Sequence, residues 1–70
     1  MKNEVELTLL VLECFLKYGP LLSIEDLRIK IKTSEKKIKS ILSVLEKRGY
    51  LAETKDAGKY MLSKKIAMLI

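Results

Sequence analysis

Gly49 marks the point at which the sequence changes from helical spacing to hairpin spacing. Before it, apolar residues recur every three or four positions, as in amphipathic helices. After it come two short apolar runs, residues 50–53 and 59–62, separated by a turn that contains Gly58. A two-stranded hairpin is marginally stable alone in water, so it must pack against the helical part. The sequence therefore predicts an α+β, mainly helical domain in which a β-hairpin follows the helices.

Three helices are predicted before Gly49, and 70 residues leave room for one domain only. The first helix covers about residues 3–18 and is stopped by Gly19-Pro20. The second covers about 24–31, with Ser23 as its N-cap and Asp26 near the positive end of the helix dipole. The third covers about 35–48, is capped by Ser34, and ends at Gly49. The hairpin then spans about 50–62, and a short apolar C-terminal segment covers residues 64–70.

The third predicted helix has one apolar face and one basic face. Its apolar residues, at helical spacing, are Ile38, Ile41, Leu42 and Leu45. The opposite side carries only cations and hydroxyls: Lys36, Lys37, Lys39, Ser40, Ser43 and Lys47. A merely solvated helix usually mixes both signs of charge, although a lysine-rich face kept for solubility remains the alternative. Residues 1–26 carry a net charge of −3 and residues 27–70 a net charge of +8, an asymmetry that indicates a polyanionic partner for the second part.

The first predicted helix has two apolar stripes. The inner stripe consists of Leu7, Leu10, Val11, Cys14, Phe15 and Tyr18. The second lies on the opposite side and consists of Val5, Leu9, Leu12 and Leu16. A helix that is apolar nearly all round is buried nearly all round, so the second stripe needs a cover. Either the C-terminal segment folds back over it, or a second chain covers it. We expect a homodimer with an interface that includes Val5, Leu9, Leu12, Leu16, Ile66, Leu69 and Ile70.

The residue inventory argues against catalysis. The chain has no His and no Trp, and its single cysteine, Cys14, lacks a partner for a disulfide or a cysteine-based metal site. Its apolar neighbours predict a buried thiol. The remaining carboxylates, lysines, serines and tyrosines form no recognisable catalytic arrangement, so we expect no enzyme, no metal and no cofactor. With no membrane-length apolar run and no signal peptide, a soluble cytoplasmic protein is expected.

From "GPLLSIEDL" through "SILSVLEKRGYLAETKDAGKYMLS" the sequence resembles the N-terminal DNA-binding domain of IclR-type transcription regulators, which is a winged helix-turn-helix. The matching residues, which follow the family's spacing without a gap over about residues 7–66, are Pro20, Leu22-Ser23, Leu27, Ser34, Leu42, Leu45, Gly49-Tyr50 and Gly58-Lys59-Tyr60-Met61-Leu62. Two features differ. The family usually has Thr-Gly-Leu between its second and third helices, whereas this chain has Ile31-Lys32-Thr33, so Lys32 is strained or the turn is changed. The family also continues into an effector-binding domain, so no small-molecule effector is expected for this chain.

The resemblance implies a role for each basic residue on double-stranded DNA. The third helix would enter the major groove, and the hairpin would be the wing. Lys36, Lys39, Ser40 and Ser43 would then approach base edges, Lys37 and Lys47 the flanking phosphates, Lys55 and Lys59 the backbone or minor groove, and Arg28, Lys30 and Lys32 further phosphates. The recognition face has no Arg, Asn or Gln, which predicts modest sequence preference in a transcription regulator. The alternative is a winged-helix module that docks a protein partner through its apolar first helix.

Overall fold

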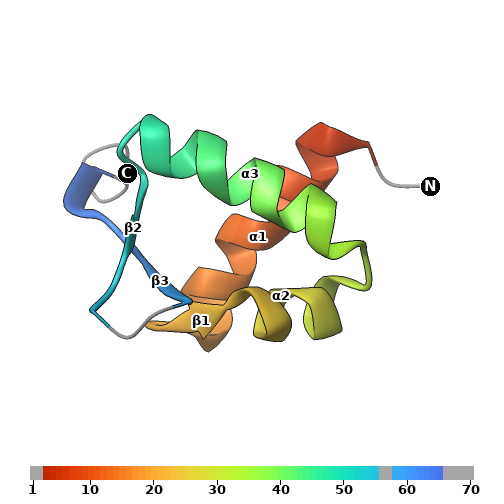
Figure 1. Ribbon diagram of the computed structural model, residues 1–70, viewed down its shortest axis with the longest axis horizontal. Coiled ribbons are helices and arrows are strands. Elements are labelled where there is room, and N and C mark those ends of the chain that lie inside the picture. Colours follow the sequence, from red (N-terminus) through yellow and green to blue (C-terminus); the bar gives the residue numbers. More distant parts are fainter. Residues whose placement is uncertain (1–2, 56–57, 66–70) are drawn as a thin grey trace.

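The structure, a computed structural model, describes residues 3–55 and 58–65, which form three helices and a three-stranded antiparallel sheet. In chain order the elements are α1 (Glu4–Tyr18), β1 (Leu22–Ser23), α2 (Ile24–Ile31), α3 (Glu35–Lys47), β2 (Leu51–Glu53) and β3 (Lys59–Leu62). The helices fill one side of the molecule and the strands close the other (Figure 1). The predicted α+β architecture of three helices followed by a hairpin is confirmed.

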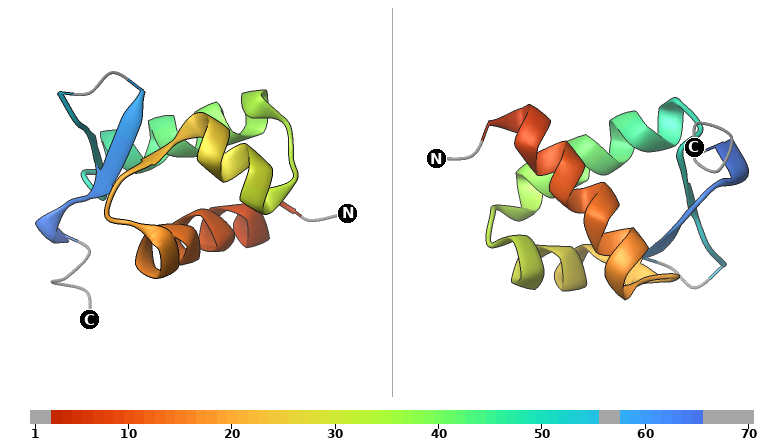
Figure 2. Two further views of the ribbon diagram at one scale, coloured as in Figure 1. Left: turned by 90° about the horizontal axis from the view of Figure 1, so that it is seen from below. Right: turned by 180° about the vertical axis from the view of Figure 1, so that it is seen from behind.

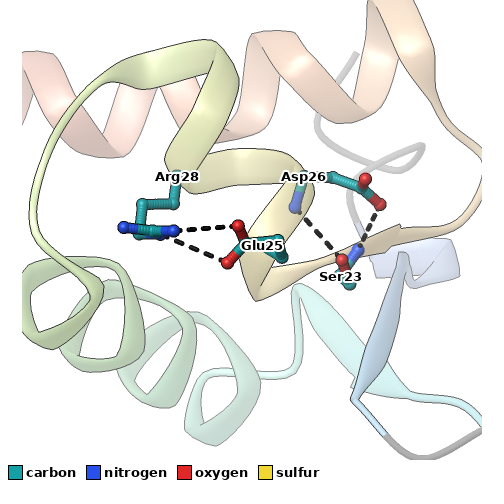
Figure 3. Close-up of polar contacts among 4 residues, drawn as sticks. All are labelled: Ser23, Glu25, Asp26 and Arg28. Atoms are coloured by element: carbon teal, nitrogen blue, oxygen red, sulfur yellow. Dashed lines mark hydrogen bonds and ion pairs between the residues drawn. The ribbon is translucent and has the colours of Figure 1, made fainter.

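Side-chain caps explain where each helix begins. The Asn3 side chain accepts a hydrogen bond from the backbone N–H of Glu6, so Asn3 caps α1 from outside the helix. At α2 the Ser23 hydroxyl accepts from the Asp26 N–H at 3.1 Å, and the Asp26 carboxylate accepts from the Ser23 N–H at 3.0 Å (Figure 3). That backbone hydrogen bond lowers the pKa of the Asp26 carboxyl. Ser34 caps α3 as predicted, accepting from the Lys37 N–H.

The hairpin is part of a larger sheet than the sequence indicated. Strand β3 lies in the centre, with β2 on one side and β1 on the other, so that Leu22 pairs with Tyr60. The sequence predicts two paired strands only, because the two residues of β1 are too few to show a strand periodicity. The hairpin is therefore supported by the segment that leads into α2. Gly58 adopts a φ of 85°, as predicted for the turn, and its N–H donates to the Glu53 carboxylate.

The core lies between the three helices and the inner side of the sheet. Its buried residues are Leu7, Val11, Cys14, Phe15, Leu22, Leu27, Ile31, Ile38, Ile41, Leu42, Leu45 and Leu51. The predicted inner stripe of the first helix is confirmed for Leu7, Val11, Cys14 and Phe15, whereas Tyr18 is 47% exposed and Leu10 only partly buried. Burial raises the pKa of the Cys14 thiol, as expected for an inert core cysteine.

The turn between α2 and α3 is strained at Lys32. This residue adopts a left-handed conformation with φ 59° and ends α2, and its N–H donates to the Arg28 carbonyl at 2.9 Å. Residues other than glycine and asparagine seldom adopt this conformation, because the Cβ atom clashes with the following carbonyl. The chain thus has a lysine in a left-handed position that suits glycine, at some expense in stability.

Replacing Lys32 with glycine should stabilise the fold by about 0.5–1 kcal/mol, because relief of the left-handed strain exceeds the added entropy of the unfolded chain. Urea unfolding followed by circular dichroism measures the change. Lys32→Ala is the matched control, since it removes the same charge and keeps a Cβ atom. A glycine variant no more stable than the alanine variant would show that Lys32 is not strained.

Candidate nucleic-acid interface

The packing of α3 fixes which of its side chains face outward. Its four buried residues, Ile38, Ile41, Leu42 and Leu45, form a stripe along the core side. All six predicted contact residues of this helix are exposed: Lys36, Lys37, Lys39, Ser40, Ser43 and Lys47. The helix lies along one edge of the molecule, with β2 and β3 beyond its C-terminal end (Figure 1). A basic, hydroxyl-bearing face is therefore presented to solvent beside the hairpin.

Two of the predicted cations are already paired with carboxylates. Arg28 donates two hydrogen bonds to Glu25, at 2.8 and 3.2 Å (Figure 3), and these bonds lower the pKa of Glu25 and raise that of Arg28. The Lys39 ammonium lies 3.4 Å from the Glu35 carboxylate, one helical turn away. Both pairs are solvent-exposed, so they are weak and can exchange for a phosphate partner.

Three lysines of α3 are free in the described part of the chain. Within residues 3–55 and 58–65, the ammonium groups of Lys36, Lys37 and Lys47 have no ion pair or hydrogen bond. Lys36 and Lys37 line a hollow of about 350 Å³ between α3 and the start of α1. Their charge is thus the part of the surface most available to an anion.

The remaining predicted cations differ in how well they are placed. Lys55 and Lys59 are exposed on the hairpin, which projects from the body of the molecule (Figure 2, left). Lys59 pairs with Ser23 in the sheet, and so lies close to the start of α2. Lys32 is exposed in the turn before α3. Lys30 instead points toward α1, with its ammonium 3.9 Å from the centre of the Tyr18 ring, so it is poorly placed for the phosphate contact that was expected of it.

Solved structures share the fold of this chain. The crystal structure of HmgR from Pseudomonas aeruginosa matches with a TM-score of 0.83 at 17% sequence identity, over 93% of this chain and 28% of that protein. A putative IclR transcriptional regulator from Silicibacter sp. TM1040 matches with a TM-score of 0.83 at 19% identity, over 96% of this chain and 26% of that protein. This chain is a winged helix-turn-helix. It spans about a quarter of the length of either protein. No protein-family model and no curated protein matches the sequence.

In this winged helix, two features of the candidate surface were not apparent from the sequence. Val44 is 56% exposed on α3, one turn beyond Ser40, although the outward face was predicted to be cationic and small polar only. The four core residues of α3 set the rotation of the helix, and Val44 lies outside the stripe that they form. Glu4 and Thr8 of α1 line the same hollow as Lys36. The Glu4 carboxylate therefore limits the positive surface on the α1 side.

The side of the winged helix formed by α1 presents an apolar surface. Val5, Leu9 and Leu16 are exposed, whereas Leu12 is half-buried against the core. The other residues predicted for a dimer interface, Ile66, Leu69 and Ile70, lie outside the described residues.

Membrane-spanning helices and metal sites are two further features for which the described residues can be checked. None of the helices in residues 3–55 and 58–65 has the length and hydropathy needed to span a bilayer. In the same part of the chain, no three Cys, Asp or Glu side chains come together as a metal site.

Proposed function

We propose that this winged helix binds double-stranded DNA and acts as a transcription regulator inside the cell, with α3 in the major groove. One observation carries the proposal: the exposed face of α3 has two serine hydroxyls and three lysine ammonium groups that are unpaired within residues 3–55 and 58–65. The major groove is about 12 Å wide and admits an α-helix. DNA presents phosphates on both rims of that groove, and exposed lysines can neutralise them with release of counterions.

The contacts follow from the position of each side chain. Lys36, Lys39, Ser40 and Ser43 approach base edges, and Lys37 and Lys47 reach the flanking phosphates. The wing places Lys55 and Lys59 on the neighbouring backbone or minor groove, and Lys32 contacts a phosphate before α3. Arg28 joins them only when a phosphate replaces Glu25 as its partner. The phosphate contacts position the protein on the duplex, and the contacts with base edges read the sequence.

Sequence preference is modest in this arrangement. The outward face has no Arg, Asn or Gln, the side chains that form bidentate hydrogen bonds with bases. Val44 adds an apolar group of the kind that contacts the methyl group of thymine. Phosphate contacts and the deformability of DNA therefore supply much of the binding energy.

The salt dependence of binding tests the proposal. If six of these cations contact phosphate, the logarithm of the association constant should fall against the logarithm of the salt concentration with a slope of about −5. Fluorescence anisotropy of a labelled random duplex between about 50 and 300 mM salt measures it. A slope near −1, or no binding at about 50 mM salt, contradicts the proposal. Selection from random duplexes then identifies any preferred sequence.

A second candidate function is docking of a protein partner through α1. It is favoured by the exposed side chains of Val5, Leu9 and Leu16, which no described residue covers. On this hypothesis the lysines of α3 serve solubility only. Charge reversal on α3 would then leave partner binding unchanged, whereas DNA binding requires those charges.

A further inference from the structure

One apolar side chain is exposed beside the polar centre of α3. Val44 is 56% exposed and lies outside the buried stripe of this helix. At about 100° per residue, it lies roughly 40° from Ser40 and 60° from Lys47 around the helix axis, and both of these are exposed. Valine is a weaker helix former than alanine or lysine, because its branched side chain has few rotamers in a helix. Since Val44 gains little from burial, helix stability alone does not explain a valine at this position.

We propose that Val44 recognises the methyl group on C5 of a pyrimidine in the major groove, so that the protein favours duplexes with thymine or 5-methylcytosine over duplexes with uracil or cytosine. This inference rests on the proposed function, because it requires α3 to lie in that groove. Of the unmodified DNA bases, thymine alone presents a methyl group there, and apolar side chains contact it. In 5-methylcytosine the methyl group is on the same ring atom, so one apolar side chain serves for both bases.

The position of Val44 relative to Ser40 fits the edge of such a base. An α-helix with its side chains is about 10–12 Å across and the major groove is about 12 Å wide, so side chains on the flank of the helix also contact the groove. In a pyrimidine, C5 lies nearer to the attached sugar than C4, which bears the hydrogen-bonding group. Ser40 lies close to the middle of the face opposite the buried stripe, and Val44 lies on its flank. Ser40 therefore faces the hydrogen-bonding groups, and Val44 faces the methyl groups, of the same base pair or its neighbour.

The polar groups of α3 near Val44 do not distinguish the two methylated bases. The Ser40 hydroxyl can both donate and accept a hydrogen bond. It can therefore pair with the O4 acceptor of thymine or with the N4 amino donor of cytosine. Carboxylates are the side chains that accept from that amino group, and the exposed carboxylates of α3, Glu35 and Glu46, lie on the flank opposite Val44. The methyl group is then the feature that raises the affinity.

Binding to pools of random-sequence duplexes tests the proposal. The pools contain thymine or uracil, each combined with cytosine or 5-methylcytosine, and they are made by polymerase extension with the corresponding deoxynucleotide triphosphates. The pool with uracil and cytosine has no C5 methyl group, and it should bind about fourfold more weakly than the pool with thymine and cytosine, the effect of burying one methyl group. Replacing cytosine with 5-methylcytosine in the uracil pool should restore most of the affinity. Competition of each unlabelled pool against one labelled duplex, followed by fluorescence anisotropy at about 50 mM salt, measures the order.

Two serine variants show whether Val44 makes the contact. Val44→Ser removes both methyl groups of the side chain, and it should bind all the pools with affinities within about twofold of one another. Because Val44 is exposed, this variant should fold, which circular dichroism checks. Ile29→Ser on α2 is the matched control, because Ile29 is 63% exposed and lies on another helix, and it should keep the full preference. The comparison of pools with the wild-type chain depends on neither variant.

The outcomes separate this inference from the proposed function. Equal affinity of the wild-type chain for all the pools overturns methyl recognition and leaves DNA binding in place. A preference that persists in Val44→Ser arises from the effect of the methyl groups on DNA shape, and it also overturns the role of Val44. Equal loss of the preference in Ile29→Ser does the same. Absence of binding to every pool at about 50 mM salt contradicts the proposed function and this inference with it.

Discussion

Reversing the charge of Lys36 and Lys47 together should weaken binding to duplex DNA by about 100-fold at moderate salt, since the attraction of Lys47 to a phosphate and that of Lys36 to base edges both become repulsions. Both side chains are exposed on the outward face of α3, and neither has an ionic partner in the described part of the chain. The slope of the salt dependence should also become shallower by about one, from roughly −5 to −4, because only Lys47 of the two contacts a phosphate. Fluorescence anisotropy with the double variant Lys36→Glu, Lys47→Glu measures both quantities.

Two single variants with the same change in net charge show whether the position of a lysine matters for DNA binding. Lys36→Glu alone should weaken binding about tenfold, whereas Lys30→Glu should weaken it less than about threefold. Both change the total charge by the same amount, but the Lys30 ammonium lies over the Tyr18 ring on the α1 side of α2. Equal losses in the two variants would mean that the protein binds DNA through its net charge alone, and the assignment of α3 as the recognition helix would then be wrong.

Leu27→Ala should remove about 3 kcal/mol from the free energy of unfolding, most of the stability that a domain of this size is expected to have. Leu27 has no exposed surface, and α2 packs against both other helices, so truncation leaves a cavity that the structure can only partly close. Urea unfolding followed by circular dichroism measures the loss. We expect a large unfolded fraction already without denaturant.

Ile29→Ala is the control for this substitution. Ile29 lies two positions further along the same helix and is largely exposed. Its truncation should change stability by less than about 0.5 kcal/mol, since alanine is also the better helix former. A loss at position 29 comparable to that at position 27 would indicate that the rotation of α2 differs from the one described.

The features that could be predicted from the sequence are those that depend on neighbours within one turn. Ser23 and Ser34 act as helix caps because the amides they bind lie three residues away. Gly58 adopts a positive φ because its own turn requires it. The buried stripe of α3 follows from helical spacing alone. Strain at Lys32 was one of the two outcomes that the sequence left open, the other being a changed turn, and the left-handed φ of Lys32 decides between them.

The features that were missed depend on distant residues or on small rotations. Strand β1 has two residues, and its partners at Lys59 and Tyr60 are more than thirty positions away, so no local pattern indicates it. The ion pair of Glu25 with Arg28 has the spacing of neighbouring turns, and that signal was present in the sequence. Exposure of Val44 depends on a rotation of α3 by a fraction of a turn.

Ser23 belongs to two structures at once: it is a residue of β1, paired with Lys59 of the wing, and it is the cap of α2. A displacement of the wing therefore also displaces Ser23 and the first turn of α2. If the wing shifts when it contacts a DNA backbone, the orientation of α2 and of α3, which packs against it, shifts as well. On the proposed function, contacts at the edge of the binding surface would in this way be coupled to the angle at which α3 meets the groove.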